Sequence, residues 1–267
     1  MTTVGTAVRP RPAWRAIALP DEHGGWGLTA EPVLLGLLVA PSWAGAALAV
    51  AAFLAFLVRT PLKLVLVDRW RHRWLERSRL AATVAAVELL ALAALALVAG
   101  LRAGWEWLIP VALAAPLVGV ELWFDMRSRG RRLVPELCGA VGIAATATSI
   151  ALVGGADAWV AAALWVVLAA RAIATIPFVR VQVGRLRRHA VHVALSDRAQ
   201  VVAAVLALSA IPLAPGVIAG AIAVVALAGA QLVWVRRPPV PAKTLGLRQL
   251  ALGLTIVAIT ALGVLTI

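Results

Sequence analysis

Nine apolar runs, separated by short polar connections, follow one another from residue 27 to residue 266. A helix needs about 20 apolar residues to cross the ~30 Å hydrocarbon core of a bilayer. The first and seventh runs are short and interrupted by proline, so either could be a re-entrant or broken helix. The pattern predicts an all-α, polytopic transmembrane bundle of about nine spans, forming a single domain over residues 1–267. The predicted spans are 27–41, 44–67, 80–100, 105–123, 134–153, 157–178, 198–213, 215–235 and 246–266.

The positive charges gather at alternate connections between these runs. The chain is 63% apolar and 14% charged, which excludes a water-soluble globular domain. Its 25 Lys and Arg outnumber 12 Asp and Glu, and 21 of the 25 lie in residues 1–22 or in the connections after every second run. Because Lys and Arg in short loops mark the cytoplasmic side, we predict a cytoplasmic N-terminal arm at 1–22. The same rule accounts for the cations without a nucleic-acid partner.

Three cations instead fall inside predicted spans. Arg59 and Lys63 stand at i and i+4, on one face of a helix. Arg59 precedes Asp68 by nine residues, which places it roughly 13 Å into its span, and Arg171 precedes Arg180 by the same nine. Charged groups at such depth are costly and are functional candidates by default. We therefore predict that Arg59, Lys63 and Arg171 bind an anion.

Several acids fall in the same half of the bilayer, and they leave two interpretations open. The acids are Glu31, Glu88, Glu121 and Glu136. The charges either pair between helices or line one polar cavity that opens to the cytoplasm, because buried charges are paired whatever else they do. In a cavity, we expect His23, Glu31 and Glu121 to position groups or exchange protons. The supporting candidates are Asp68, Thr175, Arg180 and Glu136.

Two further features bear on architecture and metals. Arg59 and Arg171 stand 112 residues apart, on two runs of the same direction, which suggests two four-helix repeats plus a ninth helix around a shared site. Cys138 is the single cysteine, and no spacing of His, Asp and Glu predicts a metal site. We expect membrane lipids as partners, no cofactor, and no nucleic acid; the oligomeric state is not predicted.

The stretch Pro20-Asp21-Glu22-His23-Gly24-Gly25-Trp26-Gly27, with Glu31-Pro32 and Leu34-Leu35-Gly36 after it, resembles the YwiC-like family of bacterial integral membrane proteins. The resemblance implies a bacterial inner membrane protein with several spans. From its residues alone, the same stretch is either an interfacial elbow, in which Asp21 caps and Trp26 anchors the first helix, or a segment in which His23 takes part in catalysis.

A more distant resemblance is to the UbiA-type intramembrane prenyltransferases. It rests on Glu121-Leu122-Trp123-Phe124-Asp125-Met126-Arg127 and on the helix start at Pro135-Glu136-Leu137-Cys138-Gly139. The resemblance implies nine helices in two repeats around an inward-facing cavity. Those enzymes hold Mg²⁺ with Asp-rich motifs, whereas the corresponding stretches here carry Arg59, Lys63 and Arg171, so Mg²⁺ is not supported.

The predicted function is therefore binding of an anionic amphiphile, such as an isoprenoid phosphate or a lipid head group, in a cytoplasm-facing cavity. Whether the protein is an enzyme stays open at this point. The alternatives are a prenyl-group transferase without the usual Asp-rich motifs, a small-anion transporter, and a purely structural membrane protein.

Overall fold

The computed structural model describes residues 17–18 and 23–267, and its helices α2 to α10 follow the nine apolar runs in order. The helices are α2 (His23–Val39), α3 (Trp43–Trp70), α4 (Glu76–Ala103), α5 (Leu108–Met126), α6 (Leu133–Val153), α7 (Ala158–Leu186), α8 (Val193–Ser209), α9 (Ile218–Trp234) and α10 (Ala242–Leu265). A single 3₁₀ turn, Pro215–Val217, leads into α9. The part of the chain described here is all-helical and contains no strand.

Seven of these helices are long and apolar enough to cross a membrane: α3, α4, α5, α6, α7, α10 and the segment Pro215–Trp234. The chain is therefore a multi-pass membrane protein. Helices α2 and α8 have 17 residues each, about 26 Å, so they fall short of a full hydrocarbon core. Nine complete spans stay a prediction.

The seventh predicted span is displaced in the structure. Helix α8 begins five residues before the predicted start at residue 198 and ends at Ser209, four residues before the predicted end. Pro212 explains the early end, because a proline disfavours helical conformation in the residue before it. In α2, by contrast, Pro32 lies inside a continuous helix.

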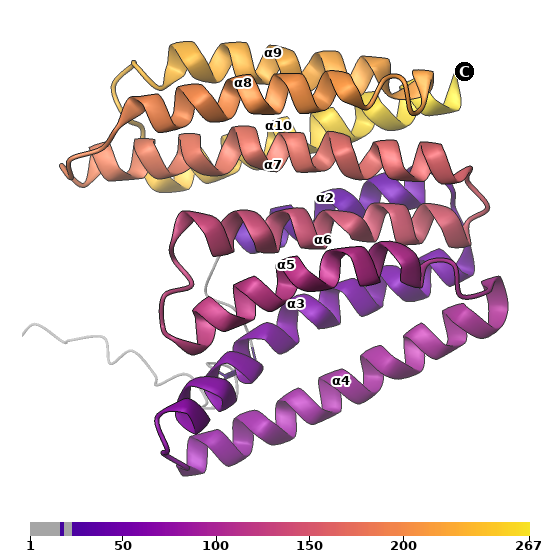
Figure 1. Cartoon of the computed structure of the whole chain (residues 1–267), viewed down its shortest axis with the longest axis vertical. Helices are drawn as coiled ribbons and strands as arrows, with labels where there is room; N and C mark the ends of the chain where they lie inside the picture. The colour runs from indigo at the N-terminus through magenta and orange to yellow at the C-terminus, as the bar shows by residue number, and fades with distance from the viewer. Residues whose placement is uncertain (1–16, 19–22) are drawn as a thin grey trace, which may run out of the picture.

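The helices stack in layers, with α2 and α6 between the group α7–α10 and the group α3–α5 (Figure 1). The largest apolar cluster joins α2 and α6 to α7, α9 and α10, and includes Leu35, Leu164 and Val224. Helix α4 is the least buried: it packs along α3 and has no comparable packing against α5, whereas α8 packs against both α7 and α9. The two halves thus pack differently, and the repeat stays a prediction.

All four basic connections lie at one end of the bundle, which we call the basic end (Figure 1). They are residues 71–75, 127–132, 187–192 and 235–241. At this end the Arg127 guanidinium lies 4.0 Å from the Trp123 ring centroid and 5.5 Å from that of Trp70, which ties α5 to α3. The connections at the opposite end, at 40–42, 104–107, 154–157 and 210–217, carry no Lys or Arg.

Asp68 holds the turn between α3 and α4. Its carboxylate accepts hydrogen bonds from Arg77 Nη2 at 3.0 Å and from Ser78 Oγ at 2.7 Å. Its side chain is 2% exposed, and it does not line the cavity described below. The sequence suggested Asp68 as a supporting residue of the site. The structure instead places its side chain in the α3–α4 turn, outside the cavity lining.

We predict that Asp68→Ala lowers stability by about 2 kcal/mol, because Ser78 and Arg77 lose a charged acceptor. The loss is measured as a lower denaturation midpoint of the purified protein. Glu76→Ala is the control, since Glu76 is exposed on the same turn. Equal midpoints for the two variants would contradict this role.

Candidate binding cavity

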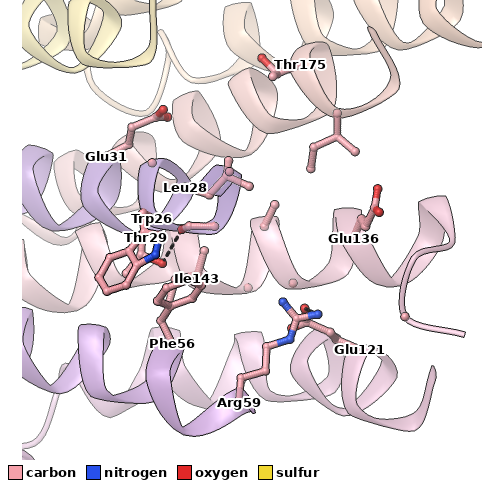
Figure 2. A pocket seen from close by; sticks show the side chains of 18 of the residues that line it. Trp26, Leu28, Thr29, Glu31, Phe56, Arg59, Glu121, Glu136, Ile143 and Thr175 are labelled. Atoms are coloured by element: carbon pink, nitrogen blue, oxygen red, sulfur yellow. Dashed lines mark hydrogen bonds and ion pairs between the residues drawn. The ribbon is translucent and has the colours of Figure 1, made fainter. Parts of the chain in front are cut away.

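A cavity of about 2650 Å³ lies between α2, α3, α5, α6, α7 and α10, with edges on α4 and α8. Most of its lining is apolar, including Phe56, Leu89, Val111 and Ile143. Figure 2 shows this interior, with Trp26 and Phe56 packed edge to face at 5.1 Å between their ring centroids. An apolar cavity of this size has room for a lipid-sized ligand.

The charged part of the lining is strongly positive. Eight Lys or Arg side chains line the cavity against three carboxylates. The cations are Arg59, Lys63, Arg131, Arg171, Arg180, Arg187, Arg198 and Lys243, and the acids are Glu31, Glu121 and Glu136. The His189 and His192 side chains lie in the same lining, near the basic end.

On one wall, α3 and α5 face each other through four charged side chains, which we call the Arg59 cluster. Arg59 Nη2 lies 2.9 Å from Glu121 Oε1, and Arg59 Nε donates to Asp125 Oδ2 at 3.1 Å. Lys63 Nζ donates to Asp125 Oδ1 at 2.9 Å. The Asp125 side chain is fully buried, while those of Arg59 and Lys63 are 28% and 36% exposed. The two cations therefore neutralise the buried acid and still face the cavity.

On the opposite wall, Arg171 of α7 pairs with Glu31 of α2. Arg171 Nη2 lies 2.9 Å from Glu31 Oε1 and donates to the backbone carbonyl of Gln249 in α10 at 2.7 Å. Both side chains are at most 4% exposed. Figure 2 shows Glu31 and Thr175 on the far side of the cavity from Arg59 and Glu121. The three cations thus form two separate groups rather than one clamp.

Three glycines make room for the buried carboxylates. A Cβ atom at Gly139 would overlap the Glu121 carboxylate, and one at Gly130 would overlap that of Asp125. A Cβ atom at Gly253 would overlap the Glu31 carboxylate and crowd Arg171. The ion pairs of Glu31, Glu121 and Asp125 therefore each depend on a nearby glycine.

The structure places the predicted site residues as follows. The cavity lining contains Arg59, Lys63, Arg171, Glu31, Glu121, Thr175, Arg180 and Glu136. Arg180 Nη1 pairs with Glu136 Oε2 at 2.8 Å near the basic end. His23 is the first residue of α2, and its side chain lies outside the described part. The three cations predicted to bind an anion are each paired with a carboxylate, and their role in binding stays a prediction.

The structure also shows candidates that sequence reasoning missed. Arg131, Arg187, Arg198 and Lys243 are exposed in the lining, and no described carboxylate forms an ion pair with them. The sequence did not single out these four cations, because the tendency of Lys and Arg to lie on the cytoplasmic side already accounted for them. Asp125 could not be recognised from the sequence, because its partners Arg59 and Lys63 are more than 60 residues away.

Arg198 keeps its charge available because its neighbour is engaged elsewhere. Asp197 accepts two hydrogen bonds from the Arg236 guanidinium, at 3.0 and 2.9 Å. This hydrogen-bonded carboxylate raises the pKa of Arg236 above its ordinary value. Asp197 therefore neutralises Arg236, and Arg198 lines the cavity without an ion pair to any described carboxylate. Within the described residues, no three His, Cys, Asp or Glu side chains are grouped as metal ligands.

Comparison with known proteins gives one match. Residues 19–151, which include all of α2 to α5 and most of α6, match the family model of YwiC-like proteins. The chain is thus similar to YwiC-like proteins over this region. The YwiC-like region contains the whole Arg59 cluster and Glu31, whereas Arg171 lies beyond it. No curated protein and no solved structure matches the chain, so the likeness to UbiA-type enzymes stays a prediction.

We predict that Gly139→Ala lowers stability by about 1–3 kcal/mol, because the added methyl group forces Glu121 away from Arg59. Thermal denaturation of the purified protein measures the loss. Gly119→Ala, on the facing helix α5, is the matched control, because a Cβ atom there meets no neighbouring atom. The prediction fails if both variants melt at the wild-type temperature.

Proposed function

We propose that this membrane protein binds an amphiphile with an anionic head group in its cavity, such as an isoprenoid phosphate or an anionic lipid. The observation that carries the proposal is the lining itself: eight cations against three carboxylates in a largely apolar cavity. Charge-assisted hydrogen bonds from Arg and Lys to phosphate are strong, and apolar walls accommodate hydrocarbon.

The head group lies at the basic end, among Arg187, Arg198 and Lys243. These side chains are exposed and pair with no described carboxylate, so binding a phosphate there breaks no ion pair. The tail extends along α3, α4 and α5, past Phe56, toward Val111. In this arrangement, Arg59 and Lys63 contact the ligand through their exposed sides while they neutralise Asp125.

The proposal places the basic end in the cytoplasm and therefore the N-terminal arm inside, in the inner membrane of a bacterium. Basic loops on one side and loops without Lys or Arg on the other support it. In this topology α2 and α8 complete a nine-helix, UbiA-like bundle. Glu31, Glu121 and His23 remain candidates for positioning groups or exchanging protons.

The orientation predicts a labelling pattern for cysteines. In a Cys138→Ser background, Ser128→Cys lies at the basic end and Ala156→Cys at the opposite end. We expect a membrane-impermeant maleimide to label Ala156→Cys in intact cells, and to label Ser128→Cys only after the membrane is opened. The reverse pattern would contradict a cytoplasmic basic end.

Ligand binding predicts a loss of affinity when the unpaired cations are removed together. We expect the triple variant Arg187→Gln, Arg198→Gln, Lys243→Gln to bind farnesyl phosphate and dioleoyl phosphatidic acid at least about tenfold more weakly, since each charged hydrogen bond contributes about 1.5–3 kcal/mol. Native mass spectrometry of the purified protein measures the two affinities.

The matched control is the triple variant Arg69→Gln, Arg73→Gln, Arg129→Gln, which removes the same charge from the basic end outside the cavity lining. It should bind both probes like the wild type. Equal losses in the two triple variants would assign binding to the general surface charge and overturn the proposal. Turnover of farnesyl diphosphate, or anion flux into proteoliposomes, would indicate group transfer or transport instead.

A further inference from the structure

The cavity reaches further on one side of the bundle than on the other. On α2 and α7 its lining ends at Glu31 and Arg171, near the middle of each helix. Between α3, α4, α5 and α6 the cavity continues away from the basic end, and we call this part the deep limb. The lining residues of the deep limb fall within 48–56 on α3, 89–96 on α4, 107–118 at α5 and 142–149 on α6.

The deep limb is apolar and about as long as one lipid chain. Its walls include Phe53, Leu92 and Val111, and no Lys, Arg, Asp or Glu lies in this part of the lining. Leu48 precedes Arg59, the nearest charged lining residue on α3, by eleven residues, which is about 16 Å of helix. One leaflet fills half of the ~30 Å hydrocarbon core, about 15 Å, so the limb matches the chain of a membrane lipid in length.

The far end of the deep limb is closed. Trp107 and Leu48 are buried there and belong to one apolar cluster with Ala44 and Ile150. Ser149 Oγ donates to the backbone carbonyl of Trp107 at 3.1 Å, which ties the start of α5 to α6. A chain that enters the limb therefore stops at this floor.

One side of the deep limb is open. Helix α4 lies at the edge of the bundle, packs along α3, and has no comparable packing against α5 (Figure 1). Leu89 of α4 and Val111 and Val118 of α5 line the limb and are 39–44% exposed. Both helices are long and apolar enough to span the membrane, so this opening faces lipid chains rather than water.

We infer that the deep limb holds one long hydrocarbon chain of a membrane lipid, which enters sideways from the bilayer between α4 and α5. The inference rests on the proposed function for the head group, and it assigns the ligand class within that function. The ligand has a chain about as long as one leaflet is thick and comes from the membrane, because only such a chain fills the limb from Arg59 to Trp107. Burying that chain against apolar walls stabilises the complex.

The first test compares two probes with the same head group and different chains. Dioleoyl phosphatidic acid has chains long enough to fill the limb, and dihexanoyl phosphatidic acid does not. With the purified full-length protein, we expect the long-chain probe to bind at least about tenfold more tightly by native mass spectrometry, since each buried methylene group favours binding.

Two variants of α5 separate the limb from its surroundings. Ala115 lines the limb, so the indole ring of Ala115→Trp takes the place of the chain. This variant should bind dioleoyl phosphatidic acid at least about tenfold more weakly and dihexanoyl phosphatidic acid like the wild type. Ala112→Trp is the matched control, because Ala112 is exposed on the same helix and does not line the cavity. It should bind both probes like the wild type.

The route of entry is tested by bridging the opening. In a Cys138→Ser background, Leu89→Cys and Val118→Cys place one thiol on each side of it. After reaction with a bismaleimide that contains a disulfide, we expect dioleoyl phosphatidic acid to load from vesicles at least about tenfold more slowly, and reduction of the bridge to restore the rate. Protein loaded before the reaction should keep its lipid.

Equal wild-type affinity for the two probes, or equal losses in Ala115→Trp and Ala112→Trp, would overturn the chain site and leave the proposed head-group function standing. Unchanged loading of the bridged protein would overturn sideways entry. Failure of both phosphatidic acids to bind would overturn the proposed function. Binding of dioleoylglycerol that is weakened by Ala115→Trp alone would then still support the deep limb as a chain site.

Discussion

The cost of placing charge in hydrocarbon is the constraint on which this architecture depends. A buried carboxylate or guanidinium is stable only with a partner close by, because the bilayer core supplies neither water nor counter-ions. Asp125 is fully buried and meets both Arg59 and Lys63, and Glu31 meets Arg171 within 2.9 Å. These pairs fix α3 against α5 and α2 against α7, so the electrostatics determines which helices form the walls.

The same pairs leave a cavity between them because they lie on opposite walls. The Arg59 cluster joins α3 and α5 on one side, and the Glu31–Arg171 pair joins α2 and α7 on the other. Glycines let the helices approach at these points without displacing the carboxylates, as at Gly139 and Gly253. Between the two walls the lining is largely apolar. The cavity therefore combines a rigid polar frame with a lipid-like interior.

The cations of the basic end have two physical roles that a count of charges cannot separate. Some, such as Arg69 and Arg73, lie outside the cavity lining, where orientation and anionic head groups account for them. Others, such as Arg198 and Lys243, line the cavity. The difference comes from the packing of α8 and α10 near α7, which brings some of the basic side chains to the rim of the cavity.

The apolar runs and the alternation of basic connections could be read directly from the sequence, because membrane insertion acts on local composition. That reading predicted an all-helical multi-pass protein with Arg59, Lys63 and Arg171 inside its spans. The partners of these cations could not be predicted, since Glu121 and Asp125 are more than 50 residues from Arg59, and pairing depends on how α3 and α5 face each other. Tertiary packing alone decided that the three cations form two neutralised groups, that Asp68 clamps a turn, and that α4 leaves the cavity open beside α5. Composition sets which segments enter the bilayer, but only the packed helices set which of them enclose the cavity and where it opens.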